Sequence, residues 1–360
     1  MNSLSRRHFL FTGVGAAITL SGTSVFAQPQ IAENVNQLGA SASTATNTFI
    51  DDGLAHPIPY IPALGIGKDR ALVLSGGGEY LLSWYMGYFH ALNQSGVDMD
   101  LADIIVGTSA GSVVGAAISG GHLKRLTIEL DFFGDFPKIL NDLVPTLALS
   151  ASQKRAIQLG LSVKAADLSS IQAVGRAAMA AHSIPGPNYA TSLKRMLGEH
   201  DWPSPKMHTT ANDCYTGERL IVSYQDGIPI QQACSASSSW PGRAGPTWLK
   251  DRYCMDGGVC QTSTHADVVM GAKRALIISL SDGGPNAAVQ GLRLSSFPNT
   301  LHQEIKDLEV SGTKTLLITA GLPPGIKTDN LLDPYLIGPA LKYGYDRGLA
   351  DTDKLKQFWS

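Results

Sequence analysis

The chain has 360 residues, of which 28 are Lys or Arg and 30 are Asp or Glu, so its formal net charge is −2. This balance excludes the basic footprint of a nucleic-acid-binding protein, and the 44% hydrophobic content excludes a disordered chain. Four cysteines in a chain of this length also exclude a disulfide-dense scaffold. Glycine accounts for 38 residues, well above its usual share, which predicts several tight backbone turns.

Residues 1–27 are predicted to be an export signal. Arg6 and Arg7 stand in S-R-R-H-F-L, which resembles the twin-arginine signal, and a weakly apolar stretch follows up to Leu20. That stretch is too short for a membrane-spanning helix, and the small residues near Ala27 suit a cleavage site. We therefore expect recognition by export machinery and a periplasmic or extracellular location. The alternative is a chance arginine pair ahead of a buried helix.

Residues 28–67 are predicted to be a flexible linker. Ser, Thr, Ala and Asn are abundant up to Thr48, and Pro57, Pro59 and Pro62 then prevent a continuous helix. One folded domain is expected from residue 68 to residue 360.

Strands and helices alternate at the start of this domain. Residues 71–74 form a short apolar run typical of a buried parallel strand, and residues 80–95 have the pattern of a helix. Residues 101–106 form a second strand-like run, and residues 112–119 a helix of small side chains. This order predicts an α/β fold with right-handed parallel connections. Such sheets place their chemistry at the carboxyl ends of the strands.

A G-x-S-x-G motif follows the second of these strands, as Gly107-Thr108-Ser109-Ala110-Gly111. In this motif the serine lies on a sharp strand-to-helix bend, where side chains in place of the glycines would collide. The serine hydroxyl is then exposed at a helix N-terminus, which favours a developing negative charge. Ser109 is therefore the candidate nucleophile, and the alternative is a purely structural Gly-Ser turn.

Three consecutive glycines, Gly76, Gly77 and Gly78, follow the first strand. Their backbone N–H groups are suited to binding an oxyanion. A dinucleotide-binding loop would require G-x-G-x-x-G, but Leu81 stands where the third glycine belongs. We therefore expect an oxyanion hole at this loop.

An acidic turn, Asp256-Gly257-Gly258, follows a third strand-like segment. Alone, such a tripeptide is usually just a turn, but beside the glycine loop and the serine motif it indicates a base. His265 follows Ser109 and Asp256 in the chain. A Ser-Asp-His triad therefore stays open beside a Ser-Asp pair.

Taken together, these motifs resemble those of the patatin-like phospholipase family across roughly residues 70–285. The matching segments, in the family's order, are S-G-G-G from Ser75, G-T-S-A-G-S from Gly107, D-C-Y-T-G-E from Asp213, A-S-S-S-W-P from Ala236 and D-G-G from Asp256. The resemblance implies a three-layer α/β/α sandwich with a central, mostly parallel sheet. It also implies a helical, lid-like insertion at about residues 122–202.

The same resemblance implies a lipid acyl hydrolase of the phospholipase A or esterase type, without a metal or cofactor. Ser109 would attack the ester carbonyl, Asp256 would accept its proton, and the glycine loop would bind the oxyanion. Water would then release the acyl-serine intermediate. A carboxylate is a weak base, so we expect the site to be partly desolvated. The implied partner is a lipid or phospholipid ester, with peripheral membrane contact and no nucleic acid.

Two segments depart from the family pattern. The family's glycine loop commonly continues with a basic residue and then glycine, whereas Glu79, Tyr80 and Leu81 follow here. We expect Glu79 to point outward at the first turn of the helix, where an acid is favourable. After the acidic turn the family usually has Asn and Pro, but Val259-Cys260-Gln261-Thr262 stand here. These departures motivate a second hypothesis, a catalytically silent patatin-fold protein that binds a lipid or a partner.

The remaining segments give weaker signals. Residues 152–161 and 171–181 are further helix candidates, and the apolar residues of 122–202 are either core or the surface of a lid that touches lipid. Residues 315–319 are predicted to form one more strand. The cysteines are predicted to be buried apolar side chains rather than a disulfide pair; they are Cys214, Cys234, Cys254 and Cys260.

Overall fold

The computed structural model describes residues 63–143, 148–163, 167–181, 186–197, 202–259, 262–283, 300–328 and 330–359. The predicted signal, nearly all of the predicted linker and Cys260 lie outside these residues. Within the described ranges, no helix is both long enough and apolar enough to cross a membrane.

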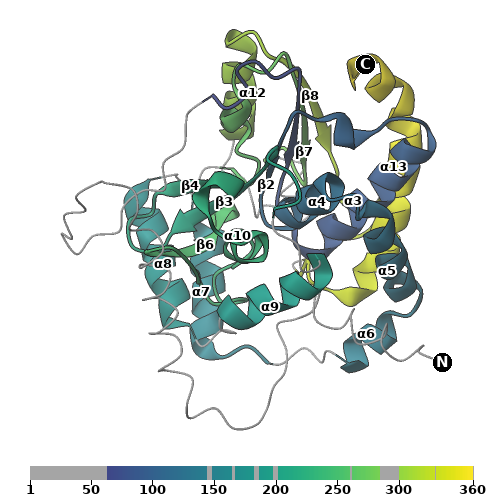
Figure 1. Ribbon diagram of the computed structural model, residues 1–360. Helices are drawn as coiled ribbons and strands as arrows, with labels where there is room; N and C mark the ends of the chain where they lie inside the picture. The colour runs from purple at the N-terminus through teal and green to yellow at the C-terminus, as the bar shows by residue number, and fades with distance from the viewer. Residues whose placement is uncertain are drawn as a thin grey trace.

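A mixed eight-stranded sheet forms the centre of the molecule (Figure 1). Its strand order is β5-β6-β3-β2-β1-β7-β8, and β4 pairs with β3 outside this path. Strands β1, β2, β3, β7 and β8 are parallel, whereas β4 and β6 run antiparallel to β3, and β5 antiparallel to β6. The strands are β1 (Arg70–Leu74), β2 (Ile104–Gly107), β3 (Met207–Asp213), β4 (Arg219–Ser223), β5 (Thr247–Leu249), β6 (Arg252–Asp256), β7 (Arg274–Ser279) and β8 (Lys314–Thr319). The predicted α/β class and mostly parallel sheet are confirmed.

Helices cover both faces of this sheet. They are α3 (Gly78–Gln94), α4 (Ala110–Ser119), α5 (Leu123–Asp135), α6 (Pro137–Leu143), α7 (Ala151–Ser162), α8 (Leu168–Ala180), α9 (Gly186–Leu197), α10 (Ile230–Ser237), α12 (Thr300–Val310) and α13 (Ile337–Trp359). Short 3₁₀ helices include η1 (Met99–Leu101), η3 (Gly257–Val259), η4 (Ala266–Val269) and η6 (Pro334–Leu336). The helices predicted at 80–95, 112–119, 152–161 and 171–181 correspond to α3, α4, α7 and α8.

The three layers follow from the alternation of side chains along each strand. Leu72 and Leu74 of β1 pack on one face with residues of α3, α4 and α13. Ala71 and Val73 point to the other face and pack with residues of η4 and α12. Because both faces are covered, β2 and residues 71–74 of β1 are short, continuous apolar runs.

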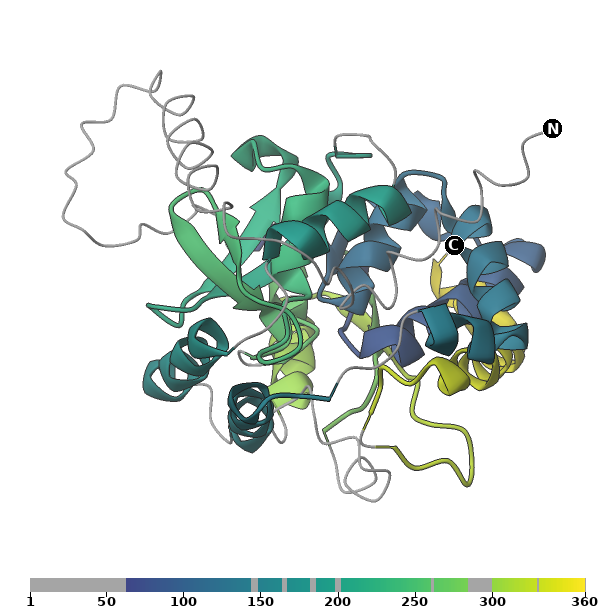
Figure 2. The same ribbon diagram turned by 90° about the horizontal axis from the view of Figure 1, so that it is seen from below.

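Four of the described helices between α4 and β3 form two separate groups, and the fifth, α9, packs against α10. Figures 1 and 2 show α5 and α6 on the side of α13, and α7 and α8 on the opposite side, near β6. Buried residues of α8 pack with Met255 of β6. The described parts of residues 122–202 are thus mainly helical, with α5 and α6 on one side of the molecule and α7 and α8 on the other.

Glycines allow α13 to pack very closely on α3. A Cβ at Gly87 of α3 would lie 2.0 Å from the carbonyl oxygen of Leu341, and one at Gly344 of α13 would lie 2.1 Å from that of Trp84. No side chain fits in either place. Because α3 begins directly at the glycine loop, this packing fixes the position of the loop's end.

The second predicted strand starts later than expected. Strand β2 begins at Ile104, and residues 99–101 form the 3₁₀ helix η1 instead. The Asp98 side chain accepts the N–H of Asp100 at 2.9 Å and so turns the chain before the strand. Leu101 is 55% exposed, so its apolar side chain does not mark a position in a buried strand.

The described cysteines confirm the prediction made for them. Cys214, Cys234 and Cys254 are buried and free. Burial raises the pKa of the Cys234 thiol to about 12, so this thiol stays protonated.

A buried ion pair anchors the start of β6. Arg252 and Asp213 are fully buried, and Arg252 Nη1 lies 3.5 Å from Asp213 Oδ2. Arg252 Nη2 also contacts Glu218 Oε2 at 2.9 Å. Asp213 and Glu218 are the two acids of the D-C-Y-T-G-E segment. This motif therefore supports the strand that ends at Asp256 instead of supplying chemistry itself.

Replacing Arg252 with Met should destabilise the fold by about 3–5 kcal/mol, because it leaves the Asp213 carboxylate buried without its partner. The measurement is equilibrium unfolding in urea. Lys342→Met is the control, since Lys342 pairs with Asp346 on the surface and its loss should cost less than about 1 kcal/mol. Equal costs for the two variants would contradict this account of the buried pair.

Candidate active site

Ser109 lies on a strained bend between β2 and α4. Its backbone has φ 51° and ψ −120°, in the positive-φ region that non-glycine residues rarely adopt. A Cβ at Gly107 would lie 2.3 Å from the carbonyl oxygen of Gly111, and one at Gly111 would lie 2.1 Å from that of Leu74. Both motif glycines are therefore required sterically, as the sequence predicted. The Ser109 N–H donates to Ser237 Oγ at 3.0 Å, which stabilises the bend.

Strand β3 brings the serine and the acid to the same place. Gly107 at the end of β2 pairs with Thr209, and Asp256 at the end of β6 pairs with Ala211. The residue between them, Thr210, contacts both motifs. Its hydroxyl lies 2.7 Å from that of Thr108, and a Cβ at Gly257 would come within 2.2 Å of it.

Asp256 is a buried carboxyl group in contact with Ser109. It is 2% exposed, its Oδ1 accepts the N–H of Gly258 at 2.7 Å, and it also accepts the hydroxyl of Ser109. Desolvation raises its pKa to about 7, although both hydrogen bonds act in the opposite direction. The main chain at Asp256 is fixed as well, because its carbonyl accepts Asn212 Nδ2 at 2.7 Å and its N–H donates to Ser239 at 3.1 Å.

The glycine loop lies against the serine. A Cβ at Gly76 would lie 2.9 Å from Ser109 Cβ. The N–H of Gly76 donates to the Ser263 carbonyl at 3.3 Å, so it is engaged within the protein. Gly78 has φ 64° and begins α3, and a Cβ there would meet the Leu331 carbonyl at 2.9 Å. The loop is thus confined between Ser109 on one side and residue 331 on the other.

The expectation that Glu79 points outward is wrong. Glu79 is only 8% exposed, because the segment around Leu331 folds over the first turn of α3 and its carbonyl accepts the Tyr80 N–H at 3.0 Å. Burial raises the pKa of Glu79 well above its usual range, nearby Asp333 raises it further, and Arg243 opposes the rise. The neutral acid is therefore favoured over a wider pH range than is usual for a glutamate.

His265 lies beside the acidic turn, with both ring nitrogens engaged. Nε2 donates to the Gly257 carbonyl at 2.9 Å, and Nδ1 accepts from Arg219 Nη1 at 3.4 Å. This pattern assigns the neutral tautomer with its proton on Nε2. Desolvation, and next the Arg219 charge, lower the pKa of His265 to about 4, against a smaller opposing effect of Asp267. The structure therefore places His265 at the backbone of the turn.

Several supporting side chains were not identified from the sequence. Ser237 and Ser239 lie in the segment A-S-S-S-W-P, where the family resemblance assigns them no role of their own. Thr210 and Asn212 lie in a strand whose partners are far away along the chain, and no motif marks them. Pairing across β3 gives both residues their roles, so only the register of the sheet reveals them.

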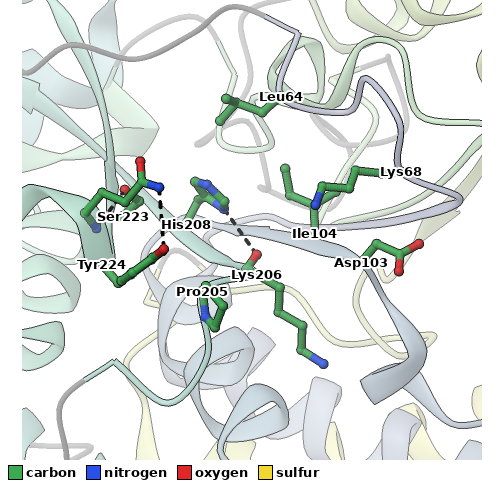
Figure 3. Close-up of a pocket in the computed structure, with 10 residues that line it drawn as sticks. Leu64, Lys68, Asp103, Ile104, Pro205, Lys206, His208, Ser223 and Tyr224 are labelled. Carbon is green, nitrogen blue, oxygen red and sulfur yellow. Dashed lines mark hydrogen bonds between the residues drawn. The ribbon is translucent and has the colours of Figure 1, made fainter.

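A cavity of about 270 Å³ lies at the other end of the sheet (Figure 3). Its lining includes Ile104, the first residue of β2, whereas Ser109 follows the last residue of that strand. His208 lines it too, with Nδ1 3.1 Å from the Lys206 carbonyl. This cavity is separate from the site formed by Ser109 and Asp256.

The chain belongs to the patatin-like phospholipase family. The family model matches residues 72–268, more than half of the chain. It is thus a member of a family of lipid hydrolases, and the family named from the motifs is confirmed. No curated protein matches the chain.

Solved structures similar to this chain include those of VipD and ExoU. VipD from Legionella pneumophila is 15% identical, with a TM-score of 0.37, and the match covers 80% of this chain and 67% of VipD. The type III effector ExoU is also 15% identical, with a TM-score of 0.32, covering 82% of this chain and 54% of ExoU. The chain therefore spans about half the length of ExoU.

We predict that His265 stays neutral from pH 5 to pH 8, because burial and Arg219 both disfavour its protonation. Its ring resonances, followed by NMR across this range, should not titrate until about pH 4. A midpoint between pH 6 and pH 7 for His265 would contradict the hydrogen-bond assignment.

Proposed function

We propose that this protein is a serine hydrolase of lipid carboxylic esters that uses Ser109 and Asp256 as a catalytic dyad. The observation that carries the proposal is the contact of the Ser109 hydroxyl with a buried carboxyl group whose pKa is raised to about 7. At that pKa the carboxylate is a useful base near neutral pH, unlike an ordinary aspartate. The strained bend at Ser109 and its position at the start of α4 support the role of nucleophile.

The proposed reaction proceeds in two halves. Ser109 Oγ attacks the ester carbonyl carbon while its proton passes to Asp256, and a tetrahedral oxyanion forms. When the C–O bond to the leaving alcohol breaks, Asp256 returns the proton to that oxygen, which leaves an acyl-serine. Water then attacks the acyl carbon, Asp256 takes the water proton, and collapse of the second intermediate returns this proton to Ser109 Oγ and releases the carboxylic acid.

The oxyanion hole is proposed to use the glycine loop. We assign Gly77 and Gly78 as the donors to the oxyanion, because Gly76 donates to Ser263. Gly78 is the first residue of α3, where N–H groups lack acceptors within the helix and the dipole favours negative charge. Gly76 is instead proposed to allow the close approach to Ser109.

The triad alternative is less well supported. A triad histidine must accept the serine proton through one nitrogen and be oriented through the other. Both nitrogens of His265 are used otherwise, on Gly257 and Arg219. We propose that His265 orients the turn that carries Asp256.

The silent alternative rested on Glu79 and on the altered stretch after Asp256. Burial favours the neutral form of Glu79, so this residue no longer argues against an oxyanion hole. A catalytically silent protein would also have no need of the contact between the Ser109 hydroxyl and the Asp256 carboxyl group.

Peripheral membrane contact is proposed to involve the side of α5 and α6. Phe132 and Phe136 are 47% and 49% exposed, and Tyr335 of η6 is 53% exposed. Helices α5 and α6 pack against η6, which follows the segment that covers the glycine loop. Aromatic side chains of this kind suit the interface of a lipid layer. Export through residues 1–27, with a periplasmic or extracellular location, remains our proposal for where the enzyme acts.

A fluorophosphonate probe should label the mature chain at Ser109, and Ser109→Ala should abolish both labelling and ester hydrolysis. Asp256→Asn should lower kcat by at least about 10³-fold, since it removes the base. Ser119→Ala is the control, because Ser119 lies on the same helix α4 with its hydroxyl on the Gly115 carbonyl. Wild-type protein that binds liposomes but is neither labelled nor active would instead establish the silent alternative.

The pH dependence should follow the ionisation of Asp256. With a pKa of about 7, the carboxyl group is protonated and inactive as a base at lower pH. We expect kcat/KM for a soluble ester to fall about tenfold for each pH unit below 7 and to level off above it. A midpoint near pH 4 would show that the carboxylate is solvated and would contradict the proposed desolvation.

A further inference from the structure

A short segment after the acidic turn contacts both halves of the proposed site. The Ser263 carbonyl accepts the N–H of Gly76 in the glycine loop at 3.3 Å. Two residues later, His265 Nε2 donates to the carbonyl of Gly257 at 2.9 Å. The segment 262–266 therefore fixes the position of the oxyanion loop relative to the base.

This segment is itself fixed by one buried acid from a distant helix. Glu304 of α12 accepts the Thr262 hydroxyl at 2.8 Å through Oε1, and the Thr264 hydroxyl at 3.0 Å and the Ala266 N–H at 2.9 Å through Oε2. Thr262 Oγ1 in turn accepts the N–H of His265 at 3.0 Å. Glu304 is 5% exposed and Thr262 and Thr264 are fully buried, so little water competes for these hydrogen bonds.

The helix that carries Glu304 is firmly attached. Leu301 and Leu308 of α12 are fully buried in a core cluster that includes Ala266 and Val268 of η4. Glu304 thus acts from a fixed backbone. Its pKa is raised to about 7, first by desolvation and then by Asp267, while its three donors oppose the rise. Asp267 is paired with Arg219 at 2.8 Å.

We propose that Glu304 is a positioning residue, which holds the segment 262–266 so that the glycine loop and Asp256 keep their places around Ser109. This inference rests on the proposed hydrolase function. It also gives a role to Thr262, one of the residues that depart from the family pattern after the acidic turn. Thr262 and Thr264 carry the hydroxyl groups that a buried carboxylate on α12 requires.

The test compares four variants of the mature chain. Glu304→Leu removes every acceptor while nearly keeping the volume, and Glu304→Gln keeps one amide oxygen for the donors. Glu309→Leu is the matched control: the same change on the same helix, where the carboxylate accepts a hydroxyl from Thr315 at the exposed surface. Leu355→Ala adds a control for lost stability, because Leu355 of α13 is buried in the core cluster on the other face of the sheet.

For each variant, kcat and KM are measured with a soluble ester, per active site titrated with the fluorophosphonate probe. Hydrogen exchange is followed in peptides covering residues 76–82 and 257–259. We expect Glu304→Leu to lower kcat by 10- to 100-fold, with KM changed less than about threefold and faster exchange in both peptides. Glu304→Gln should recover most of the loss, and Glu309→Leu and Leu355→Ala should keep kcat within about twofold.

Two results would overturn the positioning role. One is a folded Glu304→Leu variant with wild-type kcat and unchanged exchange in both peptides. The other is a Leu355→Ala variant that loses as much kcat at the same loss of thermal stability. Failure of the proposed function is distinguishable, because wild-type protein would then show no labelling, while faster exchange in Glu304→Leu would still support positioning of the loop and the turn.

Discussion

The structure depends on keeping the Asp256 carboxyl group away from water while it remains in contact with Ser109. Burial alone disfavours the charged form of the carboxyl group. The surrounding groups must therefore donate hydrogen bonds to it without lowering its pKa to the ordinary value. The Gly258 N–H and the Ser109 hydroxyl do this, and the pKa still stays near neutrality. The contacts of Asn212 and Ser239 then fix the main chain at Asp256.

This requirement explains much of the architecture around the site. The end of β2 and the end of β6 pair with the two residues of β3 that flank Thr210. The glycines at 107, 111 and 257 allow neighbouring atoms to approach more closely than a side chain would permit. The Arg252 pair secures the far end of β6. The strain at Ser109 is sustained because these neighbours leave its backbone no other position.

The sequence predicted the parts of this site that depend on local sterics. Gly107 and Gly111 are required by a bend within five residues, and the pattern of a buried strand before each motif is visible without a structure. Glu79 was misjudged because its surroundings come from residues 331–333, at the other end of the chain. Leu101 was placed in a strand because the pattern of apolar residues does not reveal the Asp98 cap. Thr210, Asn212 and Glu304 act through sheet register and helix packing, which no local pattern records.

The buried acids around the site make the stability of the fold and the proposed activity change in opposite directions as the pH rises. Asp256 and Glu304 have raised pKa values, and that of Glu79 is raised as well. A carboxyl group with a raised pKa binds its proton more tightly in the folded state, so its contribution to stability is fully present below the ordinary carboxyl pKa of about 4. That contribution is lost as the pH rises toward 7. Ionisation of Asp256 over the same range creates the base that the proposed reaction requires. The dense packing of α3 on α13 and the buried Arg252 pair therefore stabilise a fold whose active form contains a destabilising charge.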